Sequence, residues 1–130
     1  MLTQQQLDVI YEDLGRPFHI IWSNVEDVHG LSTEQLDPDS FEERKNDFLF
    51  LIGKLLDEGL LKLGDRKSEL IIEGTTTELV ERFRKCFPAL YEEVNLAGVG
   101  GLWLVTQECP FIAVWVYKGE NCEDEYEWAF

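Results

Sequence analysis

Residues 40–58 read SFEERKNDFLFLIGKLLDE, and this segment is the most informative part of the chain. Ser40 and Glu43 form a capping box, a pattern typical of a helix N-terminus. Apolar residues then recur at helical spacing: Phe41, Phe48, Leu51, Ile52, Leu55 and Leu56. Leu49 and Phe50 fall outside that stripe, so the middle of the helix is apolar on nearly every side. Because helices of this kind are normally buried, we expect this one to form the centre of the core.

Gly59 is expected to end this helix, and the apolar spacing alternates after it. Two short alternating segments, 61–63 and 70–72, flank a polar loop with a Gly-Asp turn, which predicts a β-hairpin. A second pair of strands is predicted at 102–106 and 112–117. Both strands of this pair carry apolar residues on both faces, so we expect them to be covered or to lie inside a sheet.

Helices are also predicted on the N-terminal side of the central segment. Thr3 and Gln6 form a capping box and open the first of them, which Gly15 ends. Residues 18–29 fit helical spacing, although the β-rich run 18–22 leaves a strand as the alternative. A short helical turn is expected at about residues 31–36.

Two further helices are predicted after the first hairpin. Thr75 and Glu78 form a third capping box, and Pro88 stops the helix that this box opens. A short helix follows within 90–96. The chain is therefore expected to form a single α+β domain over residues 1–130, with about five helices around the central core helix and a small antiparallel sheet of two hairpins.

Composition limits the classes of protein to consider. The chain has 130 residues, of which 45% are hydrophobic and 12% aromatic, as in a globular domain. It has no apolar run of about 18 residues, so no membrane span is expected, and its first residues have neither the basic region nor the apolar core of a signal peptide. The three scattered cysteines Cys86, Cys109 and Cys122 fit a reducing cytoplasm better than a disulfide framework.

The formal net charge is −15, which repels nucleic acid and anionic lipid and favours a basic partner. The alternative is that the charge only keeps the protein in solution. Three helices followed by a hairpin resemble a winged helix, a common DNA-binding shape. The third helix of that layout would be net acidic, with these charged residues: Glu42, Glu43, Asp47, Asp57 and Glu58 against Arg44, Lys45 and Lys54. DNA binding is therefore excluded.

No motif points to catalysis, a cofactor or a metal. His19 and His29 lie ten residues apart and the cysteines are isolated, unlike a zinc site. No nucleotide-binding glycine motif is present. Cys109 precedes Pro110 in a turn that could expose a nucleophile, but a structural turn is the better interpretation. We expect no catalytic, cofactor-binding or metal-binding residues.

The strongest binding candidate is the segment 119–130, interpreted as an acidic aromatic tail. The residues proposed to bind protein are Glu120, Glu123, Asp124, Glu125, Tyr126, Glu127 and Trp128. Aromatic side chains supply interface area, and carboxylates steer a basic partner. Two alternatives remain: a frayed terminus, or a last strand whose aromatic side chains close the core.

Short blocks of sequence resemble a bacterial family catalogued as domain of unknown function 596. The blocks lie at 48–52 with 58–63, at 83–88, and at 102–103 with 108–110 and 113–115. The resemblance runs from about residue 40 onward, and the acidic tail is not part of its pattern. It lends no catalytic residues. The resemblance implies a small acidic protein. Some similar proteins are linked with contact-dependent inhibition, in which a small cytoplasmic protein neutralises a toxin.

The leading hypothesis is a non-catalytic, cytoplasmic binding protein, such as an immunity protein that neutralises a basic, nuclease-type toxin domain. One alternative is a small enzyme, which a cleft with paired buried carboxylates, or Cys109 beside a histidine, would favour. The other is a homo-oligomeric accessory domain. A large exposed apolar patch around Trp22, Trp103 or Trp128 would favour that one.

Overall fold

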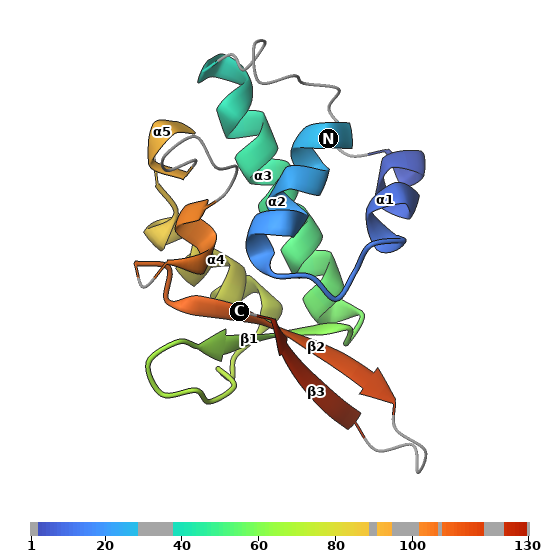
Figure 1. Ribbon diagram of the computed structural model, residues 1–130, viewed down its shortest axis with the longest axis vertical. Helices are drawn as coiled ribbons and strands as arrows, with labels where there is room; N and C mark the ends of the chain where they lie inside the picture. Colours follow the sequence, from blue (N-terminus) through green and yellow to red (C-terminus); the bar gives the residue numbers. More distant parts are fainter. Residues whose placement is uncertain are drawn as a thin grey trace.

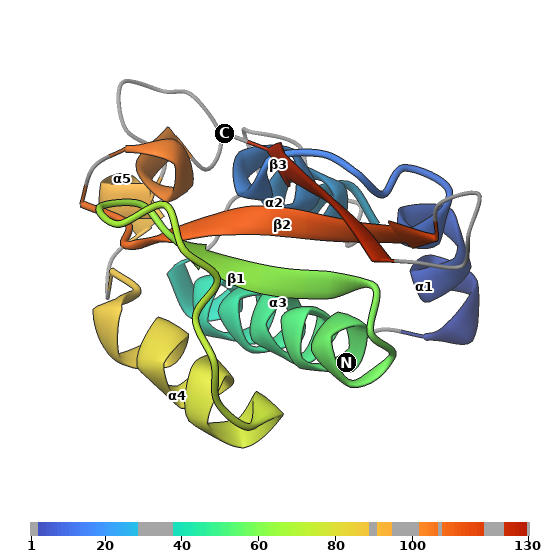
Figure 2. The ribbon, with the colours of Figure 1, turned by 90° about the horizontal axis from the view of Figure 1, so that it is seen from below.

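The computed structural model describes residues 3–28, 38–88, 91–94, 102–106, 108–118 and 124–129. Helices lie on one side of a three-stranded antiparallel sheet, as the two ribbon views show (Figures 1 and 2). The elements, in chain order, are α1 (Gln4–Tyr11), α2 (Phe18–Val28), α3 (Pro38–Asp57), β1 (Leu61–Asp65), α4 (Thr76–Cys86), α5 (Tyr91–Val94), the 3-10 helix η2 (Leu102–Val105), β2 (Phe111–Lys118) and β3 (Asp124–Ala129). The predicted α+β class is confirmed.

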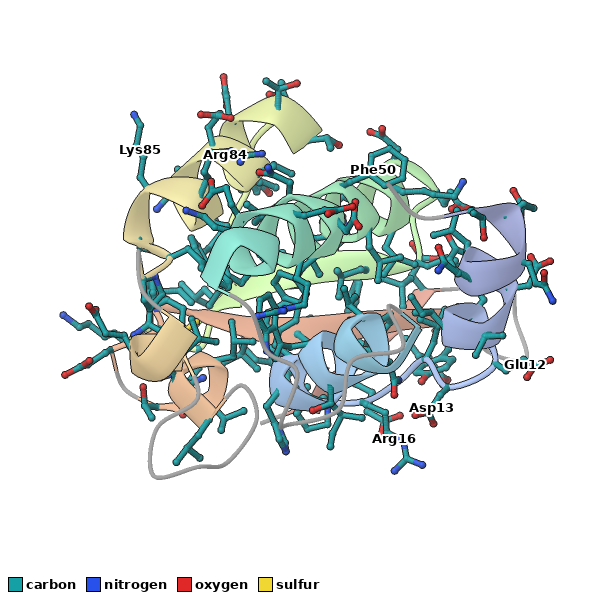
Figure 3. All side chains as sticks on the ribbon, turned by 90° about the horizontal axis from the view of Figure 1, so that it is seen from above. Glu12, Asp13, Arg16, Phe50, Arg84 and Lys85 are labelled. Carbon is teal, nitrogen blue, oxygen red and sulfur yellow. The ribbon has the colours of Figure 1, made fainter. Side chains whose placement is uncertain are left out.

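The helix α3 runs through the middle of the helical layer (Figure 1), as predicted. It begins at Pro38 and not at Ser40, because proline lacks an N–H and fits the first turn, where that donor has no helical partner. Its middle is buried at Phe48, Leu49, Leu51, Ile52 and Leu55. Phe50 is 45% exposed, so the expectation that the helix is buried on every side is wrong at this position. Figure 3 shows Phe50 on the outer side of α3.

The C-terminus of α3 has the predicted glycine cap. Gly59 has a φ of +74°, in the left-handed region that favours glycine. The N–H of Leu60 donates to the carbonyl of Leu55 at 3.1 Å, and the N–H of Gly59 donates to Leu56 at 3.2 Å. This pair of bonds is a Schellman motif, which satisfies two of the last carbonyls of the helix.

The other helices begin where their sequence signals predict, but α1 ends at Tyr11, with Glu12 as its C-cap, and not at Gly15. Both bonds of the capping box are present at the start of α1, between Thr3 and Gln6, and at the start of α4, between Thr75 and Glu78. The helical interpretation of the segment after Pro17 is confirmed by α2, and α5 lies within the short helix predicted near residue 90. The turn expected at 31–36 lies outside the described residues.

The predicted small antiparallel sheet is present, but it consists of three strands and not of two hairpins. The order of strands is β1-β2-β3, and β1 pairs with β2, from Leu61 opposite Trp115 to Asp65 opposite Phe111. The segment expected to pair with β1 makes a single isolated bridge, between Gly64 and Ile71. The first strand of the predicted second hairpin is the 3-10 helix η2. The expectation that the apolar segment 112–117 lies inside a sheet is confirmed, because β2 is the central strand.

An aromatic cluster fills the core between the helices and the sheet. The ring centroid of Phe48 on α3 lies 6.2 Å from that of Phe18 and 5.6 Å from that of Trp22, both on α2. It also lies 5.7 Å from Phe83 and 5.9 Å from Phe87, both on or beside α4. Several of these pairs meet edge to face, the arrangement that aromatic rings prefer. Phe48 therefore joins three helices at one point.

Arg66 fastens the loop after β1 to the segment before β2. Its Nε donates to the carbonyl of Cys109 at 2.9 Å. One terminal nitrogen lies 3.3 Å from the carbonyl of Leu104 and 3.4 Å from that of Phe111. Its backbone N–H donates to Pro110 at 3.0 Å. A residue that looked like part of a polar hairpin loop is therefore a structural clamp.

Replacing Arg66 with alanine is expected to lower the free energy of unfolding by about 2 kcal/mol, since charge-assisted bonds to half-buried carbonyls are lost. Lysine at this position should recover less than half of that loss, because it cannot reach several carbonyls at once. Urea unfolding followed by tryptophan fluorescence measures both. Lys67→Ala is the control, since the Lys67 side chain is exposed. Equal effects of the changes at 66 and 67 would contradict the clamp.

Candidate functional site

The segment interpreted as an acidic tail contains an ordered strand. Residues 124–129 form β3, which pairs with β2 from Ala113 opposite Ala129 to Lys118 opposite Asp124. The alternative of a last strand describes them better. Of the predicted protein-binding residues, Glu120 and Glu123 lie outside the described residues.

The strand β3 is anchored by Trp128. Trp128 lies opposite Val114 of β2, and its ring covers Gly64 of β1. A Cβ atom built on Gly64 would stand 2.3 Å and 2.7 Å from two ring carbons of Trp128. It would also lie 2.9 Å from a methyl group of Val114, so only glycine fits here. The ring therefore spans all three strands on the sheet face that carries Gly64.

The remaining predicted residues of β3 are on the surface. Asp124, Glu125, Tyr126 and Glu127 are all exposed, and Tyr126 retains 46% of its accessible surface. Glu125 and Glu127 are two residues apart and so lie on one face of the strand, while Tyr126 lies on the other. The structure therefore presents a carboxylate-rich strand held in place by one aromatic side chain.

The loop between α1 and α2 packs against β2 on the sheet face that also carries Glu125 and Glu127. Trp115 of β2 donates from its indole nitrogen to the carbonyl of Arg16 at 2.9 Å. Asp13 accepts a hydrogen bond from Asn24 at 3.1 Å and pairs with Arg16 at 3.0 Å. These interactions lower the pKa of the Asp13 carboxyl, and the hydrogen bond from Asn24 is the largest single cause. Figure 3 shows Asp13 and Arg16 on the surface.

A cavity of about 380 Å³ opens beside β1 and reaches Tyr126. Its lining is partly apolar, with Leu61, Leu63, Ile72 and Leu79 among the residues. Lys62, Glu73 and Thr76 add polar groups. Sequence reasoning missed this cavity because it forms where the chain leaves β1 to begin α4, a divergence that hairpin prediction does not include.

Cys109 is not in the exposed turn considered from sequence. It is fully buried, and its thiol donates to the carbonyl of Phe111 at 3.6 Å. Burial raises the pKa of Cys109 to about 12, so almost none of it is the reactive thiolate at neutral pH. This observation weighs against the cysteine route to an enzyme. Among the residues that the structure describes, no cluster of potential metal ligands is found.

Two of the charged side chains counted on the central helix lie inside the protein. Arg44 is fully buried and Asp47 is 5% exposed, so neither contributes to a charged groove-binding face. Trp22 and Trp103 are buried in the core. They therefore form no part of the exposed apolar patch that would have favoured a homo-oligomer.

Comparisons with known proteins identify relatives without describing an activity. The model of a family described as "Protein of unknown function, DUF596" matches residues 56–129, more than half of the chain. The match includes β3, so the expectation that the acidic segment lies outside the family pattern is wrong. No curated protein is similar enough in sequence to match.

A solved structure, that of an uncharacterised protein conserved in bacteria from Neisseria meningitidis, has a similar fold. The TM-score is 0.66 at 27% identity, over 94% of this chain and 89% of the other. Within the described parts of the chain, no helix combines the length and the apolar character needed to span a bilayer.

Proposed function

Because the chain belongs to the DUF596 family, whose function is unknown, we propose its function from the geometry of β3: it is a non-catalytic protein that binds a basic protein partner. The observation that carries this proposal is the exposed, carboxylate-rich strand at the edge of the sheet. A net charge of −15 acts in the same direction, because it speeds the encounter with a positive surface.

A nuclease-type toxin domain is the partner that fits this chemistry best. Proteins that bind nucleic acid carry clustered Lys and Arg side chains to neutralise phosphates. Carboxylates on a rigid strand can pair with the same cations and so block access to the nucleic acid. In this proposal the protein is an immunity protein that acts in the cytoplasm of the cell that makes the toxin.

The test begins with the gene immediately upstream. We expect it to encode a large secreted protein with a variable, basic C-terminal domain, whereas a metabolic operon would count against the proposal. The association rate of that purified domain with this protein should fall steeply between low and physiological salt, because exposed charges are screened. Turnover of a small molecule by the purified protein, abolished by one substitution in a pocket, would also end the proposal.

A charge-matched pair of variants locates the binding surface. The double change Glu125→Gln and Glu127→Gln should slow association by about 5- to 10-fold at low ionic strength and reduce its salt dependence. The control is Glu42→Gln with Glu93→Gln, which removes the same charge from exposed positions on α3 and α5. If both double variants slow association equally, net charge alone matters and β3 is not the site.

A further inference from the structure

We propose that the partner binds by strand addition: one of its segments pairs along the outer edge of β3 and extends the sheet. This inference rests on the proposed function, because it names the mode by which a basic partner would be recognised. In strand addition, backbone hydrogen bonds supply affinity, and side chains at alternate positions supply specificity.

The alternation of hydrogen bonds along β2 shows which backbone groups of β3 point outward. The N–H of Val116 donates to the carbonyl of Leu60, on the β1 side of the sheet. In an antiparallel sheet the backbone groups of successive residues point to opposite sides, so Trp115 and Tyr117 direct theirs to β3. Their partners there are Glu127 and Glu125. The backbone N–H and C=O of Tyr126, between those two, therefore point away from β2.

No other strand among the described residues pairs with that edge, since β3 is last in the order β1-β2-β3. An open edge of this kind is a template for another strand. The edge is also ordered in advance, because the Trp128 ring is seated over Gly64. A strand that is already fixed loses little conformational entropy when a partner binds it.

The side chains of β3 specify which strand can pair there. Glu125 and Glu127 lie on one face and are both exposed. Lys or Arg at alternate positions of the added strand would lie across from them, and opposite charges across a strand pair are favourable. Tyr126 on the other face favours an aromatic or β-branched residue. The expected ligand is therefore an extended segment in which basic and β-branched residues alternate.

The same side chains disfavour a second copy of this chain as the occupant. Pairing β3 with another β3 would place the carboxylates of Glu125 and Glu127 close to those of the copy. Like charges across a strand pair are destabilising. Charged edge strands are a common protection against self-association, and here the same charge would select a basic partner.

The test uses peptides and the full chain labelled with ¹⁵N. The first peptide alternates lysine with valine over seven residues. The second has the same composition with the lysines consecutive. The third is the alternating peptide with two N-methyl groups on the backbone amides that would face β3. We expect the alternating peptide to shift the Tyr126 amide and to slow its hydrogen exchange. N-methylation should weaken binding by about 10-fold or more, since it removes backbone donors and leaves the charge unchanged.

Two substitutions of Tyr126 test the same backbone hydrogen bonds by changing this protein and not the peptide. Tyr126→Pro removes an outward N–H without removing a hydrogen bond of the β2–β3 ladder, as is tolerated at sheet edges. It should weaken the alternating peptide by about 10-fold. Tyr126→Ala keeps the N–H and should weaken binding of the alternating peptide by less than about 3-fold. If the proline change detaches β3, which the amide shifts of Trp128 would report, the N-methylated peptide decides the question.

Equal binding of the alternating and N-methylated peptides would overturn strand addition, as would the absence of peptide binding at millimolar concentration. Neither result contradicts the proposed function, which is tested by the charge-matched variants and by binding of the toxin domain. Conversely, if those double variants show no difference, the proposed function loses its site, whatever the peptides do.

Discussion

Phe48→Ala is expected to lower the free energy of unfolding by about 3–5 kcal/mol, among the largest effects that one core substitution produces. The side chain is fully buried and meets rings from α2 and α4. Alanine would leave a cavity where those helices meet, and the surrounding rings are too tightly packed to fill it without strain. Urea unfolding followed by tryptophan fluorescence measures the loss directly.

Phe50→Ala is the matched control, because it makes the same substitution two residues along the same helix. Phe50 is 45% exposed, so the change should cost less than about 1 kcal/mol. Similar losses for the two variants would mean that the stability of α3 depends on its helix propensity and not on the aromatic cluster.

Gly64→Ala is expected to cost about 1–3 kcal/mol, the range for inserting an atom into a packed site. The added methyl group would overlap two ring carbons of Trp128, so either the ring or β3 must move. Trp128→Ala alone should cost about 2 kcal/mol, because the indole is half-buried.

The double variant separates a specific contact from a general weakness of the sheet. With the indole removed, the Gly64→Ala change should cost much less, so the two changes should differ from additivity by at least about 1 kcal/mol. Urea unfolding of the four proteins completes the cycle, and the amide shifts of β3 report whether the strand detaches. Strict additivity would show that Trp128 does not rest on Gly64.

Two of the three predicted capping boxes and the glycine cap of α3 were reliable because they act within a few residues, whereas α3 begins before Ser40 and α1 ends before Gly15. Thr3 with Gln6, and Thr75 with Glu78, each bond across one helical turn, and Gly59 supplies a φ that other residues adopt only with strain. Phe50 shows the limit of this reasoning. Its apolar character predicted burial, but burial depends on what packs against that side of α3.

Strand pairing was predicted wrongly because a nearby partner was preferred to a distant one. Ile71 makes only an isolated bridge to Gly64, while the distant β2 pairs along the whole of β1. That pairing places Leu61 and Leu63 beside Trp115 and Ala113 in the core, and no local pattern announces it. A strand at 124–129 was only an alternative for a related reason: the carboxylates of 124–127 lower strand propensity, but an edge strand can keep them in solvent.

The amino-acid sequence by itself determined most of the helices, the central position of α3, the strong negative charge and the family. These properties depend on spacing and composition within short windows, or on the chain as a whole. Only the tertiary structure decided that the acidic segment 124–129 is a strand, that Trp128 lies over Gly64, and that this strand is the last in the order β1-β2-β3. Each of these requires contact between residues far apart in the chain, and the packing energy that selects such contacts is set by the folded molecule.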